Sequence, residues 1–352
     1  MYIESVQIQG VRNLEQAVIH PNQKTNIFTG RNASGKTSFL EALHILARSK
    51  SFRTHRIRDV INHSEDILTI TADIKHEFYK PLKLKIKKGG KTNSLTLNNE
   101  NIKSVSELAK ILPIITITQD SQQIITGSPK QRRHWLDWAM FHVEPKYLLS
   151  WKQYFKALRH RNILLKHGER KVEIYRPWEE EMIKLAKNIT DQRRSFLKQL
   201  ATELKQGVEK KTINPVEVIF KQGWPEENDL DVYLCSQREQ DQKKGFTRNG
   251  PHQADITFQT ETADINKVFS RGQIKIFVNQ LLITQARVIQ EIRKITPIVL
   301  IDDYTAELDR ENSKHLLEVI KKQENQVFIT TTEWEEREND VTLFHVEKGV
   351  LS

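Results

Sequence analysis

One stretch decides the fold: Gly30-Arg31-Asn32-Ala33-Ser34-Gly35-Lys36-Thr37, which satisfies the phosphate-loop pattern G-x-x-x-x-G-K-[ST] at every fixed position. The alternating residues 25–29 before it predict a strand, and the helical spacing of apolar residues after it predicts a helix that starts near Lys36. The loop N–H groups and the helix N-terminus would then present positive charge to a triphosphate. We therefore predict that all eight residues bind ATP, that Lys36 reaches its β- and γ-phosphates, and that the Thr37 hydroxyl holds Mg²⁺. A glycine turn that matches by chance is the alternative, and the correct flanks argue against it.

A second feature is the continuous apolar run 297–301, which ends in Asp302 and Asp303. Such a run is typical of a strand buried on both faces of a parallel sheet. A carboxylate at the end of that strand is placed to orient Mg²⁺, so we predict Asp302 as a metal partner. Asp303 would activate water for attack on the γ-phosphate and is the predicted catalytic residue together with Lys36. Most of the chain separates Thr37 from Asp302, which implies a large insertion.

Composition narrows the class of protein. The chain has 352 residues, 38% of them hydrophobic and 28% charged, which is enough for a well-buried core and for two structural units. No apolar run approaches the ~20 residues of a membrane span, and the N-terminus lacks the features of a signal peptide. The single cysteine, Cys235, excludes an internal disulfide and suits a reducing cytoplasm. We therefore expect a cytoplasmic protein without a membrane partner.

The charge balance points to a polyanionic partner. The net charge is +10, and between Lys130 and Lys171 Lys and Arg outnumber Asp and Glu by eleven to three. From this stretch and a first basic cluster after the loop helix, the predicted DNA contacts are Arg53, Arg56, Arg58, Arg132, Arg133, Lys152 and Arg159. For the first cluster a solvated helix end is the default explanation, and contact with nucleotide or nucleic acid is the alternative. Ion pairs at the joint between core and arm are the alternative for Arg132 and Arg133.

The remaining periodicities outline the architecture. Short strands are predicted at 2–9 and 16–19, an antiparallel sheet over 67–98 with a hairpin turn at Gly89-Gly90, and a buried strand within 111–118. Strand-like segments at 216–220 and 256–258 bracket a polar helical piece. Two helices with a break at His167-Gly168 predict an antiparallel hairpin, an arm in which Pro177 suits the start of the second helix. The predicted seam of the first helix is Leu148, Trp151, Phe155, Leu158, Asn162 and Leu165, and that of the second includes Met182, Leu185, Ile189 and Leu200.

The motif Ser270-Arg271-Gly272-Gln273 opens a further predicted helix. Locally it is a capping box, which needs no ligand. It also resembles the LSxGQ signature of ATP-binding-cassette (ABC) ATPases, with Phe269 in place of the leucine, and Ala306-Glu307-Leu308-Asp309 resembles their D-loop. The resemblance implies that Ser270 and its neighbours contact the γ-phosphate held by a second subunit, with Glu307 and Asp309 in the D-loop.

The match narrows to one family, the bacterial recombination mediators of the RecF type, which the chain resembles along essentially its whole length. The motifs that carry the resemblance occur in that family's order: Gly127-Ser128-Pro129, Arg132-Arg133, Leu136-Asp137, residues 141–148, Arg161-Asn162 to Lys166, Gly250-Pro251-His252, Ser270–Gln273, Leu300–Asp303 and Glu307–Asp309. The implied fold is α/β, an ABC-type P-loop ATPase head with an antiparallel β subdomain and an inserted helical arm. We expect residues 1–124 and 293–352 to form the ATP-binding core and residues 125–292 the arm with the signature.

The family also implies a function. Its members dimerise on ATP, bind double-stranded DNA near single-strand gaps and junctions, hydrolyse ATP slowly, and help RecO and RecR to load RecA. ATP and Mg²⁺ are the implied cofactors, and the chain is expected to be a weak, DNA-stimulated ATPase. The alternatives from other classes are the motor subunit of a membrane transporter and a scaffold that binds nucleotide but uses hydrolysis little. A small-molecule kinase is a more distant alternative.

Several positions depart from the family pattern, among them Gln253, where a basic residue is common. Ala33 stands where glycine is usual, so the loop must accept a Cβ there. Gln119 stands in place of a common proline and is predicted as the Q-loop residue that senses Mg²⁺. Residues 330–332 follow a strand where related ATPases place a histidine, and Thr331 is the predicted replacement.

Overall fold

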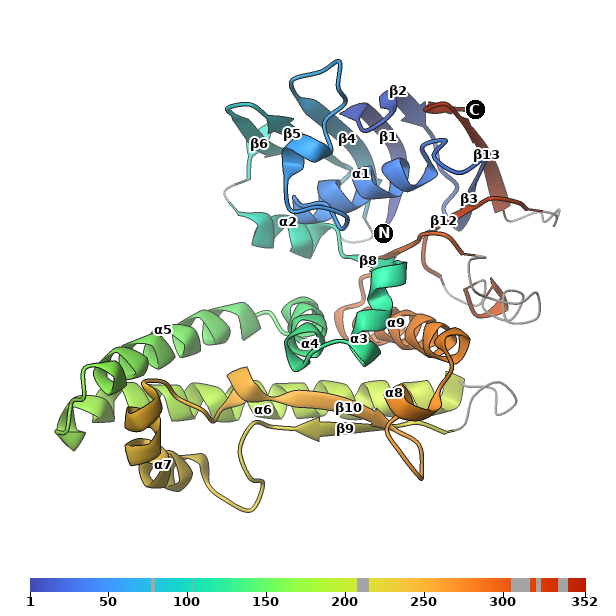
Figure 1. Ribbon diagram of the computed structural model, residues 1–352. Helices are drawn as coiled ribbons and strands as arrows, with labels where there is room; N and C mark the ends of the chain where they lie inside the picture. Colours follow the sequence, from blue (N-terminus) through green and yellow to red (C-terminus); the bar gives the residue numbers. More distant parts are fainter. Residues whose placement is uncertain (77–79, 103, 208–214, 305–316, 321–323, 335–340) are drawn as a thin grey trace. The chain divides into compact units, whose positions relative to one another are not determined.

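The phosphate-loop helix, α1 (Lys36–Arg48), is buried on nearly every side and lies between two β-sheets (Figure 1). This burial explains why Phe39, Leu40, Leu43 and Leu46 are accompanied by further apolar residues around the whole helix. The computed structural model describes residues 1–352 except 77–79, 103, 208–214, 305–316, 321–323 and 335–340. The chain divides into two units, the first formed by residues 1–121 and 271–352 and the second by residues 122–270.

An antiparallel sheet covers one side of α1 in the first unit. Its strand order is β2-β1-β4-β5-β6-β7. The bounds are β1 Tyr2–Val11, β2 Leu14–Ile19, β4 Leu68–Lys75, β5 Leu82–Gly89, β6 Thr92–Leu97 and β7 Glu100–Asn101. Gly89 pairs with Thr92 across the predicted hairpin, with φ of 143° at Gly89 and 54° at Gly90. The prediction of an antiparallel sheet over 67–98 is therefore confirmed.

A second sheet in the same unit has the order β14-β13-β3-β12-β11-β8, and all its strands except β14 run parallel. The bounds are β3 Thr25–Thr29, β8 Ile114–Ile117, β11 Ile298–Ile301, β12 Val327–Thr331, β13 Val341–Glu347 and β14 Val350–Leu351. Every residue of β11 is buried, as the apolar run predicts. Phe28 of β3 stacks on Phe39 of α1 at 4.3 Å between ring centroids, which joins this sheet to the loop helix.

The described part of the first unit also contains α2 (Val105–Ile111), a 3-10 turn (Ile57–Asp59) and α9 (Arg271–Arg293). Residues 277–286 of α9 are all buried, and the helix packs against β8. The expected arm, residues 125–292, therefore differs from the second unit chiefly at its C-terminal boundary. The sequence places the signature helix with the arm, whereas its buried residues join it to the parallel sheet.

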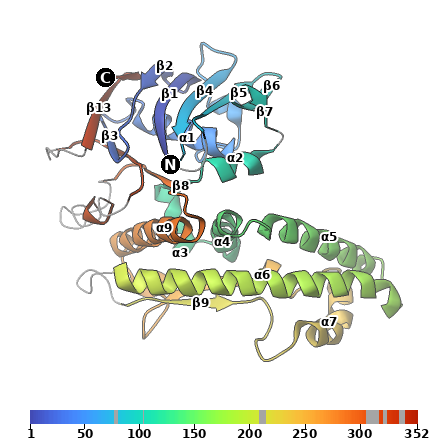
Figure 2. The same cartoon turned by 180° about the vertical axis from the view of Figure 1, so that it is seen from behind.

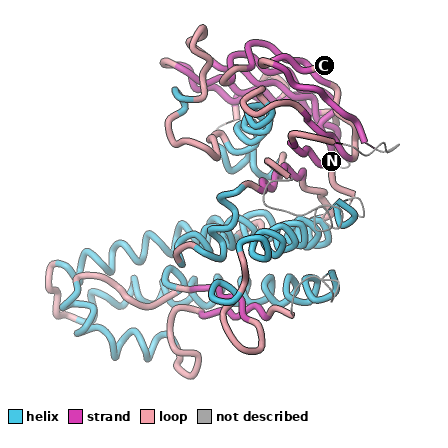
Figure 3. The backbone as a smooth tube through the Cα atoms, turned by 45° about the vertical axis from the view of Figure 1, so that its right-hand side comes forward, coloured by secondary structure: helices cyan, strands magenta, loops and turns pink. Residues whose placement is uncertain are grey.

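The second unit is mainly helical (Figure 3). Helices α5 and α6 lie side by side and form the predicted hairpin (Figures 1 and 2). β9 and β10 pair antiparallel. The bounds are α3 Gln123–Thr126, α4 Pro129–Val143, α5 Tyr147–Lys166, α6 Val172–Gly207, β9 Glu217–Lys221, α7 Leu230–Lys244, β10 Asp255–Gln259 and α8 Ile265–Val268, with 3-10 turns at Gln119–Gln122, which straddles the two units, and Pro251–Gln253.

The seam of α5 differs from the predicted one by about one position. Its buried residues are Tyr147, Ser150, Tyr154, Ala157, Leu158, Arg161 and Leu165, whereas Phe155 of the predicted seam is 40% exposed. The reason is that Arg161 lies in the core. Its Nε donates to Glu179 of α6 at 2.9 Å and its Nη1 donates to Asp241 of α7 at 2.9 Å, so the buried charge is paired.

The start predicted for the second arm helix is wrong. α6 begins at Val172, and Pro177 lies inside the helix. Proline has no N–H to donate to the carbonyl oxygen of residue 173, so α6 lacks one backbone hydrogen bond near its first turn. The predicted stripe on α6 is confirmed, since Met182, Leu185, Ile189 and Leu200 are all buried.

Candidate functional site

The phosphate loop joins β3 to α1, and three of its residues have positive φ. The angles are 149° at Gly30, 62° at Ala33 and 121° at Gly35. Glycine adopts such angles without strain, but a Cβ in the left-handed region costs about 1–2 kcal/mol. Ala33 therefore holds a strained conformation, as expected from the Cβ that replaces the usual hydrogen.

Contacts from two other parts of the first unit hold the loop. Asn13, between β1 and β2, donates through Nδ2 to Ala33 O at 3.3 Å and accepts from Ser38 Oγ at 2.9 Å. Gly349, in the turn between β13 and β14, donates its N–H to Ser34 O at 2.8 Å. The phosphate-loop pattern does not reveal these contacts, because they come from residues far from the loop in sequence.

Lys36 lies at the centre of the loop. Its Nζ donates to Gly30 O at 2.6 Å and to Arg31 O at 2.9 Å. Burial lowers the pKa of Lys36, while the charges of Asp303 and Asp302 act in the opposite direction. The lysine and both aspartates therefore share one electrostatic environment, as the sequence predicts.

Asp302 follows β11 and receives two hydroxyl groups. Thr37 Oγ1 donates to Asp302 Oδ1 at 2.9 Å, and Thr330 Oγ1 donates to the same oxygen at 2.8 Å. Burial raises the pKa of Asp302; the hydroxyls of Thr330 and Thr37 and the Arg53 charge lower it, and Asp303 raises it. The structure thus brings together Thr37 and Asp302, which lie 265 residues apart in the chain.

Asp303 is exposed, and its backbone is in the left-handed region at a φ of 53°. Its N–H donates to Thr330 Oγ1 at 2.8 Å, which helps to hold this conformation. The same threonine therefore contacts both aspartates.

The predicted sensor residue is Thr331, but the hydroxyl that reaches Asp302 and Asp303 belongs to Thr330. Thr331 Oγ1 donates to Glu333 O at 3.0 Å. Successive side chains of β12 point to opposite faces of the sheet, so of two neighbouring threonines only one has its hydroxyl on the side where Asp302 lies. The sequence signal, three consecutive threonines, could not separate these positions.

Gln119 lies at the same sheet edge as the aspartates. Ile117 of β8 pairs with Ile301 of β11, and Asp302 donates its N–H to Ile117 O at 2.9 Å. Gln119 follows two residues later, exposed, at the start of a 3-10 turn. Its role as a metal-sensing residue stays a prediction.

The signature motif stands at the start of α9. Ser270 is exposed and immediately precedes the helix, whose first turn contains Arg271, Gly272 and Gln273. Lys275, in the next turn, donates through Nζ to Asp303 O at 3.4 Å. The action of the motif on a second subunit stays a prediction, and the D-loop residues Glu307 and Asp309 lie outside the described residues.

Arg53, which lies near the candidate site, stays a predicted DNA contact. Its Nη1 lies 3.7 Å from Oε2 of Glu41, a buried carboxylate of α1 that also accepts from Arg12 Nε at 2.9 Å. The Arg53 charge is close enough to lower the pKa of Asp302. The ion pair between Arg53 and Glu41 was not predicted from the sequence, because Glu41 has the pattern of any solvent-facing polar residue of the helix.

The other predicted DNA contacts fall into two groups. Arg132 pairs with Asp255 of β10 at 2.7 Å, and Arg133 Nη1 donates to Ala254 O at 2.8 Å. The alternative role, an ion pair, is therefore the one seen for Arg132, with an acid of the arm itself. The second group is exposed and comprises Arg56 and Arg58 of the first unit with Lys152 and Arg159 of α5.

In the described part of the chain, none of the helices combines the length and apolar character needed to cross a bilayer.

Known proteins are similar to this chain along its whole length. A family model described as "RecF/RecN/SMC N terminal domain" matches residues 2–350. The "DNA replication and repair protein RecF" of Pseudomonas syringae pv. syringae (strain B728a) is 33% identical over 361 residues, covering 100% of this chain and 98% of that protein. The protein of the same name from Pseudomonas fluorescens (strain SBW25) is also 33% identical, with the same coverage.

Solved structures show the same fold. One, described as "Structure of the recombination mediator protein RecF-ATP in RecFOR pathway", has a TM-score of 0.86 at 23% identity and covers 100% of this chain and 97% of that one. An SMC head bound to the C-terminal winged-helix domain of ScpA has a TM-score of 0.56 at 18% identity, covering 100% of this chain and 96% of that one. The fold is thus that of an ABC-type ATPase head, and the chain belongs to the RecF family.

Proposed function

We propose that this chain is an ATP-dependent DNA-binding protein of DNA repair and replication, and that it hydrolyses ATP slowly. The observation that carries the proposal is the hydrogen bond from Thr37 Oγ1 to Asp302 Oδ1 at 2.9 Å. It joins the phosphate loop to the acidic strand end, the two parts that a P-loop ATPase needs. The names of the relatives, DNA replication and repair proteins, support the process.

The residues at the site fit Mg·ATP. Thr37 and Asp302 offer the oxygen ligands that Mg²⁺ prefers. Ser34 Oγ is buried in the phosphate loop and has no hydrogen-bond partner in the described part of the chain, so it can donate to a phosphate oxygen. Bound Mg²⁺ would neutralise the negative charge of the phosphates during transfer.

The protein groups supply position and charge. Lys36 and the loop N–H groups would bind the phosphates, with Thr37 and Asp302 on the metal. Asp303 would orient the attacking water and accept its proton at a carboxylate oxygen. Because aspartate is one methylene shorter than the glutamate of many ABC ATPases, we expect slow turnover.

We further propose that ATP joins two copies of the chain. Ser270 and Gly272 of one copy would complete the site of the other, so that ATP binding controls the dimer. Duplex DNA near a single-strand gap or junction would bind to exposed cations and stimulate hydrolysis. RecO and RecR would be the partners in loading RecA, in the cytoplasm.

Sedimentation velocity with and without Mg·ATP tests the shared site. We expect wild type to shift to a dimer, and Ser270→Arg to stay monomeric while calorimetry still detects ATP uptake. Lys267→Ser, at an exposed position three residues before the signature motif, is the matched control and should still shift to a dimer. A wild-type monomer at saturating Mg·ATP would contradict the shared site, and absence of ATP uptake by wild type would contradict the proposed function itself.

A further inference from the structure

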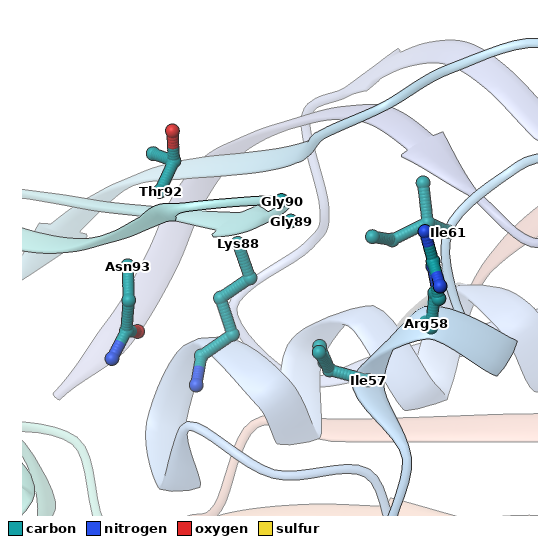
Figure 4. Close-up of a pocket in the computed structure, with 8 residues that line it drawn as sticks. All are labelled: Ile57, Arg58, Ile61, Lys88, Gly89, Gly90, Thr92 and Asn93. Carbon is teal, nitrogen blue, oxygen red and sulfur yellow. The ribbon is translucent and has the colours of Figure 1, made fainter.

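A pocket in the first unit, away from the phosphate loop, is lined by positive side chains (Figure 4). Its volume is about 560 Å³. The 3-10 turn Ile57–Asp59 and the residues after it form one wall, with Ile57, Arg58 and Ile61, and the β5–β6 hairpin forms the other, with Lys88 and Asn93. None of the residues that line it is acidic.

Lys88 is in an unusual place for a lysine. Side chains of β5 alternate, and Lys88 shares its face of the sheet with Leu84 and Ile86, which are fully buried. In Figure 4 its side chain extends to the same side of the hairpin as that of Asn93, with which it pairs in register. The ammonium group has no hydrogen bond or ion pair in the described chain, and burial alone lowers its pKa.

Arg58 supplies a second cation. Its side chain is exposed and, within the described residues, is likewise without a hydrogen bond or ion pair. In folded proteins most half-buried cationic side chains lie beside a counter-charge, because burial disfavours the ionised form of an unpaired group. The half-buried, unpaired Lys88, in a concave surface whose lining residues include no acid, therefore favours an anionic ligand.

The hairpin backbone is fixed, which gives the pocket a defined wall. A Cβ at Gly89 would lie 2.2 Å from Asp66 O, so only glycine fits there. The hollow that adjoins the pocket, of about 380 Å³, contains Glu65 and Asp66 and is less suited to an anion. The two isoleucines beside the cations add an apolar surface that a sugar or base can contact, and Thr92 and Asn93 add hydrogen-bonding groups.

We propose that this pocket binds the phosphate of a nucleotide unit, with Lys88 as the phosphate ligand and Arg58 on the other wall as a second positive charge. The phosphate can belong to a DNA strand or to a free nucleotide. Binding of a DNA phosphate rests on the proposed function of the chain, whereas binding of a free nucleotide does not.

Two binding measurements on the full chain test the proposal and separate the two sources. The first is the affinity for a fluorescein-labelled gapped duplex at constant salt with Mg·ATP present. The second is the affinity for AMP by calorimetry in a Lys36→Ala background, which weakens uptake at the phosphate loop. Lys88→Gln is compared with Lys87→Gln, which removes the same charge from the opposite face of β5.

We expect Lys88→Gln to weaken binding about tenfold, the loss typical of one charge-assisted hydrogen bond, with Lys87→Gln within about twofold of wild type. Lys88→Arg should retain most of the affinity, which controls for folding. A loss for DNA alone identifies a strand phosphate, and a loss for AMP identifies a free nucleotide.

Equal affinities of the Lys88→Gln and Lys87→Gln proteins in both measurements overturn the proposal. So does a wild type that binds neither ligand. Failure of the proposed function is a separate result, because it is read from Mg·ATP uptake by wild type and not from the comparison of the two lysines.

Discussion

Thr330 connects the two aspartates of the candidate site, since its Oγ1 donates to Asp302 Oδ1 and accepts from the Asp303 N–H. We expect Thr330→Val, which keeps the shape and removes the hydroxyl, to lower kcat for ATP hydrolysis by about 10- to 100-fold, because Asp303 loses the contact that holds its backbone. ATP affinity should change less than about threefold, since the phosphate loop is untouched. Steady-state kinetics and calorimetry measure the two quantities. Thr331→Val is the control, and an equal loss of kcat in both variants would assign the effect to the strand as a whole.

Asp302 also affects stability. Burial raises its pKa in the folded protein above the value in the unfolded chain. The protonated carboxyl therefore stabilises the fold at a pH below the unfolded pKa, and this stabilisation is lost as pH rises through the folded pKa. At neutral pH the ionised carboxylate therefore destabilises the fold. We expect Asp302→Asn to melt at a higher temperature than wild type at pH 7 without nucleotide, with a difference that shrinks on acidification.

Thermal unfolding followed by circular dichroism between pH 4 and pH 8 measures this effect. The amide oxygen of Asn can still accept from Thr37 and Thr330, so the comparison isolates the charge. Asp66→Asn, at an exposed position, is the control. A lower melting temperature for Asp302→Asn at pH 7 would show that the positive charges of Lys36 and Arg53 stabilise the ionised Asp302 carboxylate by more than burial destabilises it.

At the scale of single elements, the arm depends on a buried charge cluster. Arg161 of α5 is fully buried between Glu179 of α6 and Asp241 of α7. We expect Arg161→Met to lower the free energy of unfolding of the arm by about 1–3 kcal/mol, because two buried carboxylates lose their shared partner while Glu179 keeps Arg238 and Asp241 keeps Arg248.

Urea denaturation with limited proteolysis of the second unit measures this loss. Arg159→Met, an exposed position on the same helix, should change stability by less than about 0.5 kcal/mol. If the two variants unfold alike, the cluster does not stabilise the arm.

The same helix shows where sequence patterns succeed and where they fail. The hairpin of α5 and α6 was predictable because apolar residues recur at helical spacing and a glycine marks the break. The seam was not, because Arg161 counts as polar in any pattern although its charge is paired inside the core. The start of α6 was misplaced for a related reason, since a local preference of proline yielded to packing along a long helix.

At the scale of the whole molecule, the nucleotide site was predictable because its chemistry is concentrated in two short motifs. Gly30–Thr37 and Asp302-Asp303 each carry their own flanking strand signal, so the parallel sheet brings them together by topology. The residues that support these motifs come from distant segments. Asn13, Glu41, Thr330 and Gly349 act through contacts that depend on the folded sheets, and no local pattern marks them.

The net charge of +10 leads to a prediction about DNA affinity, in which the exposed cations of each unit are tested separately. If binding neutralises phosphates without base contacts, log affinity should fall linearly with log salt. Two double variants, Arg56→Gln with Arg58→Gln and Lys152→Gln with Arg159→Gln, should each reduce the magnitude of the slope by about 2 when both residues contact phosphate. Lys243→Gln with Lys244→Gln removes the same charge from exposed positions of α7 and should leave the slope unchanged. Each slope is measured by fluorescence anisotropy with gapped DNA at salt concentrations from about 50 to about 300 mM. An unchanged slope for one pair removes its unit from the interface, and a flat response of wild type would remove the phosphate backbone from recognition altogether.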